Sequence, residues 1–297
     1  MQLTIGSAPD SWGVWFGDDA RQTPWHRFLD EIAEAGYEWT ELGPFGYLPT
    51  DPKTLKQEVD KRGLKVTGSF VEGDLSNPET SWPRIERQLR GWGDIFHQFD
   101  AKFLVLIQDC YTNLFTGEQI APARLDRFAF ARLVDTTHKV ARIAREDYGM
   151  TLVFHPHAQT HIEYEDQIEQ FLDATDPALV SIVLDTGHHS YCGGDPVSFM
   201  RKHHARIPYL HLKSVDPALR TRVAAENIPF AQAVGMGMFV EPSKGAVDFM
   251  AFRDLLHEID YQGFGIVEQD MFPVPTFDKP LPIARRTRAY LREIGMG

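Results

Sequence analysis

Histidine and acidic residues stand where several short apolar runs of this sequence end. Val180 to Leu184 is apolar and largely β-branched and stops at Asp185, and Ile207 to Leu212 carries His211 near its end. Such runs predict buried parallel strands. The carboxyl ends of consecutive parallel strands meet at the edge where barrel and open-sheet enzymes have their active sites. We therefore expect Asp185 and His211 to lie side by side.

The same pattern brings further polar residues to this edge, namely Glu41, Gln108, His155, His157, His188, Lys213 and Glu268. Carboxylates and imidazoles are ligands for Mn²⁺, Co²⁺, Mg²⁺ and Zn²⁺, and burying several carboxylates without a cation is costly. The convergence predicts a divalent metal site. A polar strand end can also serve only to satisfy the backbone of a loop, and this alternative stays open for Glu41 and Gln108.

Apolar spacing along the chain predicts alternating strands and helices. The expected strands are Leu3 to Ile5, Tyr37 to Leu42, Leu64 to Val71, Phe103 to Ile107, Thr151 to Phe154, Val180 to Leu184, Ile207 to Leu212 and Phe264 to Val267. The expected helices are Pro24 to Ala35, Pro52 to Gly63, Trp82 to Phe99, Leu125 to Tyr148, Tyr164 to Leu172, Asp195 to His204, Asp248 to Ile259 and Ile283 to Ile294. This alternation predicts an α/β fold, a (β/α)8 TIM barrel forming a single domain over residues 1–297.

An open α/β sheet is the alternative fold. It usually carries a glycine-rich nucleotide loop after the first strand, and Gly6-Ser7-Ala8-Pro9 is not such a loop. The segment 216–247 reads as long and irregular and is rich in Gly, Pro and Met. Because it is too long for a simple connector, we expect it to cover the active site.

Composition narrows the classes of partner. The 297 residues are 43% hydrophobic, and 30 basic against 42 acidic residues give a net charge of −12. This balance disfavours nucleic acid as a partner. The two cysteines, Cys110 and Cys192, make no disulfide framework, which favours a cytoplasmic location. No apolar run approaches the roughly 18 residues of a membrane span, so no membrane partner is expected.

Four motifs, FHPHAQTHIE, LDTGHHSYCGGDP, YLHLKSV and GIVEQD, resemble the sugar isomerase/epimerase superfamily of xylose isomerase-like barrels. The N-terminal GSAPDSWGVWF and ELGPFGYLPTDP are most similar to its inosose dehydratase branch. In this superfamily a metal is held by Glu, Asp, His and Glu at the ends of strands five to eight. The resemblance implies that Asp185, His211 and Glu268 are three of the ligands.

Strand five departs from the superfamily pattern, because His155-Pro156-His157 stands where many relatives have Glu-Asn-His. Either His155 is the fourth ligand, or Glu163 reaches in, or water fills the place. Epimerases of the superfamily exchange protons through two metal-bound glutamates, and one of that pair is missing here. The departure therefore favours chemistry with one base.

The resemblance implies site roles for the remaining residues. His188 is expected to bind a substrate hydroxyl, with Glu41, Gln108 and Glu163 as further substrate contacts. The base and the acid of the reaction are sought among Glu268, His157 and Lys213. Mn²⁺ or Co²⁺ is the expected cofactor, with Mg²⁺ or Zn²⁺ as alternatives.

These expectations describe a metal-dependent hydro-lyase that removes water from 2-keto-myo-inositol or a similar polyhydroxylated ketone. The metal would polarise the ketone oxygen and stabilise an enediolate when the α-proton is removed. The alternative is an aldose–ketose isomerase or epimerase on the same site, and a non-catalytic sugar-binding barrel carries less weight. The expected partner is a small polyhydroxylated carbonyl compound, and homo-oligomerisation is left open by the sequence.

Overall fold

A closed barrel of parallel strands forms the centre of the molecule in the computed structural model, which describes residues 1–297. The barrel strands are β1 (Gln2–Ser7), β2 (Trp39–Glu41), β3 (Lys65–Gly73), β4 (Phe103–Gln108), β5 (Thr151–Phe154), β6 (Val180–Asp185), β7 (Tyr209–Leu212) and β10 (Gln262–Val267). Their order around the barrel is β1, β10, β7, β6, β5, β4, β3 and β2, closing back on β1. The predicted (β/α)8 barrel is confirmed.

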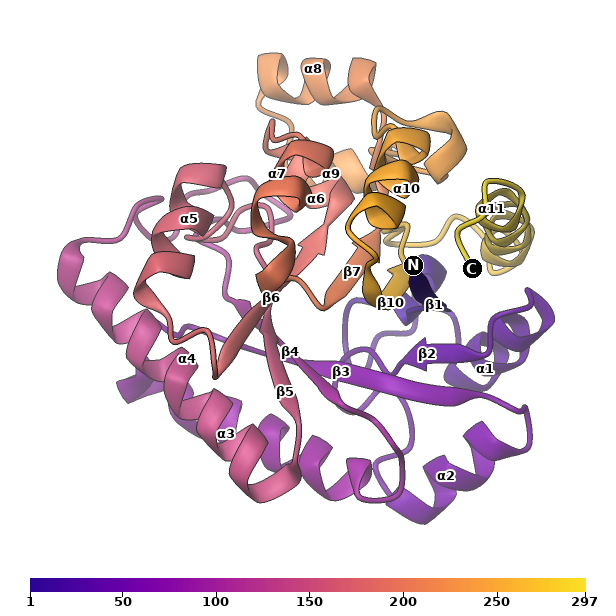
Figure 1. Cartoon of the computed structure of the whole chain (residues 1–297), viewed down its shortest axis with the longest axis horizontal. Helices are drawn as coiled ribbons and strands as arrows, with labels where there is room; N and C mark the ends of the chain where they lie inside the picture. Colours follow the sequence, from indigo (N-terminus) through magenta and orange to yellow (C-terminus); the bar gives the residue numbers. More distant parts are fainter.

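A helix follows each barrel strand and packs on its outside (Figure 1). These helices are α1 (Trp25–Glu34), α2 (Pro52–Asp60), α3 (Pro78–Phe96), α4 (Arg127–Tyr148), α5 (Glu165–Ala174), α7 (Pro196–His203), α10 (Phe249–Glu258) and α11 (Pro280–Glu293). Local sequence fixes their ends: the Asp126 carboxylate accepts from the first backbone N–H groups of α4, and Gly149 ends that helix with φ 67°. None of the helices is both long and apolar enough to cross a membrane.

Two apolar layers hold the barrel together. A cluster of 56 buried residues fills the space between strands and helices. A smaller cluster fills the barrel interior and consists of Ala8, Val105, Val153, Val183, Tyr209 and Ile266. Successive side chains of a strand point to opposite faces, so each strand supplies both layers. The interior layer closes the barrel from below and leaves the polar residues at the carboxyl ends of the strands.

The segment 216–247 is more regular than its sequence indicates. It contains α8 (Pro217–Glu226) and α9 (Phe230–Gly235), and its strand β9 (Phe239–Val240) pairs antiparallel with β8 (Ser214–Val215). The prediction of an irregular segment was wrong because α8, which lies at the top of Figure 1, buries only Val223 and so shows no apolar periodicity. A further short helix, α6 (Thr186–Tyr191), follows β6 directly and was also not predicted.

Candidate active site

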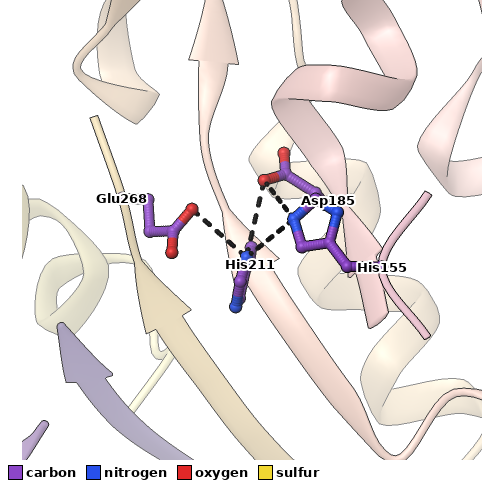
Figure 2. Close-up of side chains that lie close together, drawn as sticks. All are labelled: His155, Asp185, His211 and Glu268. Carbon is purple, nitrogen blue, oxygen red and sulfur yellow. Dashed lines mark hydrogen bonds and ion pairs between the residues drawn. The ribbon is translucent and has the colours of Figure 1, made fainter. Parts of the chain in front are cut away.

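Four side chains with metal-binding atoms meet at the carboxyl end of the barrel: His155, Asp185, His211 and Glu268. They come from β5, β6, β7 and β10, which are consecutive in the barrel. One ligand atom from each lies within 4.8 Å of those of the other three, and all four residues are buried. Asp185 is paired with His211 in the register of β6 and β7. Figure 2 shows the other three side chains grouped around His211.

Glu41 at the end of β2 fixes the orientation of the His211 ring. His211 Nε2 lies 2.9 Å from Glu41 Oε1, and because a carboxylate only accepts, this nitrogen carries the hydrogen. His211 Nδ1 is the ring nitrogen that faces the cluster and could bind a metal, 3.1 Å from His155 Nε2 and 3.2 Å from Glu268 Oε2. A carboxylate behind a histidine ligand is a common arrangement around protein metal sites.

The two oxygens of Asp185 have different tasks. Oδ1 accepts hydrogen bonds of 2.8 Å from the backbone N–H groups of Gly187 and His188, which caps α6. Oδ2 is buried and lies 3.1 Å from Lys213 Nζ, 3.5 Å from His155 Nε2 and 3.6 Å from His211 Nδ1. A carboxylate is costly to bury unless cationic or hydrogen-bonding groups surround it. Two imidazoles and two carboxylates therefore fit a divalent cation such as Mn²⁺, Co²⁺ or Zn²⁺.

The electrostatics of the cluster favour positive charge at its centre. Burial alone would raise the pKa of the Asp185 carboxyl, but Lys213 and His188 hold that pKa well below its usual value. Burial would lower the pKa of His211, but Glu268 and Glu41 raise it well above its usual value. Burial would also raise the pKa of the Glu268 carboxyl, but His211 and Lys213 lower it. The field of Asp185 and Glu268 thus favours a positive charge at His211, either a proton or a metal ion bound there.

Lys213 is an internal cation beside the cluster. Its side chain is 1% exposed, and Nζ lies 2.8 Å from Glu268 Oε2 and 3.1 Å from Asp185 Oδ2. Nζ also donates to both oxygens of Asp270, at 3.0 and 3.1 Å. Burial would lower the pKa of this lysine, but the carboxylates of Asp185, Asp270 and Glu268 raise it well above its usual value. The ammonium is therefore charged and lies among the carboxylates of these three residues.

A cavity of about 190 Å³ opens above the cluster. Its lining includes three cluster residues, His155, His211 and Glu268. It also includes the aromatic rings of Trp15, Phe16 and Phe230. A cavity lined both by convergent polar groups and by aromatic rings suits one small molecule with hydroxyls and a ring.

His157 lines this cavity as a neutral imidazole. Its Nδ1 lies 2.7 Å from the carbonyl oxygen of Ala158, which only accepts, so Nδ1 carries the hydrogen and Nε2 the lone pair. Burial holds the pKa of His157 well below its usual value, and the neighbouring His188 adds to this. The rings of His157 and His188 are 3.8 Å apart. Both histidines at the end of strand five thus enter the barrel mouth, as the strand period predicts.

Two expected substrate contacts lie in other surroundings. Gln108 lines the cavity, but its Oε1 accepts from Leu75 N at 2.7 Å and its Nε2 donates to Asp74 at 3.0 Å. Its amide is thus engaged in holding loop backbone and a neighbouring carboxylate. Glu163 is outside the lining of the cavity, where Tyr111 OH donates to it at 2.6 Å. The structure therefore brings His155, and not Glu163, to the cluster.

Several residues of the site went unrecognised in the sequence. Asp270 lies two positions after Glu268 and, by the strand period, points the same way. The motif GIVEQD could therefore have predicted it. Asp10 follows the first strand and lines the cavity, and the reasoning applied to the other strand ends would have found it. The rings of Trp15 and Phe16 carried no signal, because they lie in an irregular loop, whereas Phe230 lies in the segment 216–247 that was expected to cover the site.

Comparison with known proteins agrees with this geometry. Residues 29–294 match the family described as Xylose isomerase-like TIM barrel. The chain is 32% identical to an inosose dehydratase of Geobacillus kaustophilus (strain HTA426) over 97% of this chain and 93% of that protein. It is 28% identical to an inosose dehydratase of Clostridium beijerinckii over 94% of each chain.

Solved structures share the fold at low identity. The IolI protein with a bound zinc atom superposes with a TM-score of 0.72 at 16% identity, covering 97% of this chain and 98% of IolI. An L-ribulose 3-epimerase gives a TM-score of 0.72 at 17% identity, covering 99% of this chain and 94% of the epimerase. At these identities the likeness concerns the barrel alone.

Proposed function

The chain belongs to the xylose isomerase-like TIM barrel family, and from this premise we propose that it is a dehydratase acting on 2-keto-myo-inositol or a similar cyclic polyhydroxylated ketone. The observation that carries the proposal is the pairing, in one cavity, of a metal-ligand cluster with the neutral base His157. The similarity to inosose dehydratases over nearly the whole chain supports the same activity.

His155, Asp185, His211 and Glu268 would hold the cation, and Glu41 would orient His211. When bound, a divalent metal supplies a Lewis acid for the ketone oxygen and an adjacent hydroxyl. Mn²⁺ or Co²⁺ is the proposed ion, since a mixed nitrogen and oxygen ligand set suits both.

The chain itself supplies the proton transfers and the orientation of the substrate. His157 Nε2 has a lone pair and takes the α-proton. His188, with its Nδ1 buried and unpaired, binds a substrate hydroxyl. The rings of Trp15 and Phe230 cover the carbon face of the substrate and keep water from the reactive carbanion.

The charge of the cavity favours an uncharged substrate. Six carboxylates line it, and the one lysine of the lining is enclosed by three carboxylates. A phosphate or carboxylate on the substrate would meet like charges with no free cationic side chain to compensate. We therefore propose neutral polyols and ketones as the substrate class, and phosphosugars and sugar acids as poor ligands.

The test is product identification with the purified, metal-loaded protein. We expect 2-keto-myo-inositol to lose water and give a conjugated, ultraviolet-absorbing ketone, with Mn²⁺ or Co²⁺ supporting turnover and phosphorylated sugars giving none. An isomerised or epimerised product without water loss would replace the proposal by the isomerase alternative. Metal binding with no turnover of any ketoinositol or ketose would indicate a binding protein.

A further inference from the structure

Asp10 is a carboxylate of the cavity that neither the metal cluster nor the chemistry described above uses. It lies in the 3₁₀ turn Pro9–Trp12 just after β1 and is half-buried. In the order β1, β10, β7, β6, β5, strand β5 is four places from β1 in a barrel of eight strands, which is directly across the mouth. Asp10 and His157, which follows β5, therefore lie on opposite walls of the cavity that both of them line.

The other five carboxylates of the cavity lining each have a basic partner within 4 Å. Glu41 pairs with His211 at 2.9 Å, and Glu268 and Asp270 pair with Lys213 at 2.8 and 3.0 Å. Asp109 and Glu72 both pair with Arg84. The Asp10 carboxyl has no hydrogen bond or ion pair within the protein, and only burial and more distant charges act on it. It is thus the one carboxyl of this lining that is free for a substrate.

We propose that Asp10 is a second catalytic residue, which contacts the departing β-hydroxyl of the substrate and gives it a proton from the wall opposite His157. This inference rests on the dehydratase function proposed above. Lys213 is the competing proton donor, but its buried ammonium donates to Asp270 and forms ion pairs with Glu268 and Asp185 at 2.8 and 3.1 Å. Three carboxylates therefore stabilise its charged form and oppose loss of its proton.

The elimination balances with these two residues. His157 Nε2 takes the α-proton, and the electron pair of the C–H bond forms the new carbon–carbon double bond. The β C–O bond breaks with its electron pair on oxygen, which takes the Asp10 proton and leaves as water. Solvent then returns a proton to Asp10 and accepts one from His157, so no oxidant or further reactant is needed.

The surroundings of Asp10 support a carboxyl that keeps its proton. Burial raises its pKa well above the usual value, and Glu268 and Asp270 act in the same direction, while Lys213 opposes them. A carboxylic acid whose pKa is raised holds its proton to higher pH and is better suited to donate it.

The experiment separates removal of the α-proton from loss of the hydroxyl, using Asp10→Asn in the metal-loaded enzyme. In D₂O with 2-keto-myo-inositol, we expect dehydration to fall by about 10²-fold or more, the usual loss for a general acid, while deuterium still enters the α-position. In an analogue with fluorine in place of the β-hydroxyl, the leaving group is fluoride, which needs no proton from an acid. The variant should therefore release fluoride at the wild-type rate, and Asp10→Glu should regain part of the dehydration.

Asp18→Asn is the matched control, because Asp18 is an exposed carboxylate of the same loop. It should dehydrate like the wild type. Full dehydration by Asp10→Asn, or equal loss of deuterium exchange and dehydration with metal content intact, would overturn the inference. If Asp10→Asn does not fold, Asp10→Ser is put through the same assays. Failure of the dehydratase function would look different, since the wild type would then eliminate neither water nor fluoride.

Discussion

Glu41 Oε1 lies 2.9 Å from Nε2 of His211, across the barrel mouth from a strand that is not its neighbour. Through this contact Glu41 holds the imidazole ring of His211, one of the four proposed metal ligands, in its orientation. A similar contact lies one layer below. The Tyr209 hydroxyl donates to Thr67 Oγ1 of β3 at 2.8 Å, beneath the site. The metal cluster is thus supported by polar groups from the half of the barrel that supplies no ligand.

Replacing Glu41 by Ala should weaken metal binding without removing a ligand. Losing the partner of a ligand histidine typically costs about 10- to 100-fold in metal affinity, because the ring loses its preferred tautomer and orientation. Titration of the apo-protein with Mn²⁺ against a competing chelator measures the change. Glu38→Ala serves as control, since Glu38 is exposed and lies on the same chain segment. Unchanged affinity in Glu41→Ala would contradict the positioning role.

Asp185→Asn should abolish metal binding and leave the fold intact. Asparagine keeps an oxygen that accepts from the backbone N–H groups of Gly187 and His188, so the cap of α6 survives. Its second group is an amide nitrogen, which cannot ligate a metal as Oδ2 does.

The measurement for this variant is thermal unfolding with and without metal. Mn²⁺ at about 100 times its dissociation constant should stabilise the wild type by about 2.7 kcal/mol and Asp185→Asn not at all. Equal stabilisation of both proteins would show that Asp185 is not a ligand.

The site residues that could be predicted from the sequence are those at the ends of the barrel strands. Asp185, His211 and Glu268 each end a continuous apolar run, and a parallel barrel brings the ends of such runs together whatever the helices between them do. The same rule brought His155 and His157 to the barrel mouth, because residues two apart in a strand point the same way, but it left open whether His155, Glu163 or water takes the fourth ligand place.

The site features that could not be predicted lie in segments whose sequence has no helix or strand periodicity. Glu163 is eight residues beyond His155 in a loop, and only the tertiary structure shows that it turns to Tyr111 and away from the cavity. The aromatic wall is built from Trp15, Phe230 and Phe272, which stack although they come from three separate parts of the chain.

Helix α9 should close over the bound substrate. Its Phe230 lines the cavity and is buried, with its ring 6.0 Å from that of His188 and 6.3 Å from that of Trp15. Substrate or a product analogue should therefore slow amide hydrogen exchange in residues 228–240, since a lid opens less often when its ligand is present. Met238 and Phe239 belong to a buried cluster of eight residues, which gives this segment a small core of its own.

The variant Phe230→Ala tests by enzyme kinetics whether α9 covers the site. The variant should lower kcat/KM by exposing the site to water, whereas Phe128→Ala, on the outer surface of α4 and 60% exposed, should not. Exchange in residues 228–240 that is indifferent to substrate, together with normal turnover of Phe230→Ala, would show that the segment only packs on the barrel.

His157→Ala should stop the reaction while the metal stays bound. The neutral Nε2 is the proposed base, and losing a general base costs about 10²-fold or more in turnover. Because His157 is not among the four ligands, metal affinity should match that of the wild type. His204 is an exposed histidine at the end of α7, and His204→Ala is the control.

The same reasoning predicts that the wild type does not epimerise its substrate, since His155 stands where a second acid-base glutamate would be needed. The chirality of recovered substrate and the turnover of His157→Ala decide the matter together: rapid inversion at the α-carbon, or full activity in the variant, would mean that a different residue moves the proton.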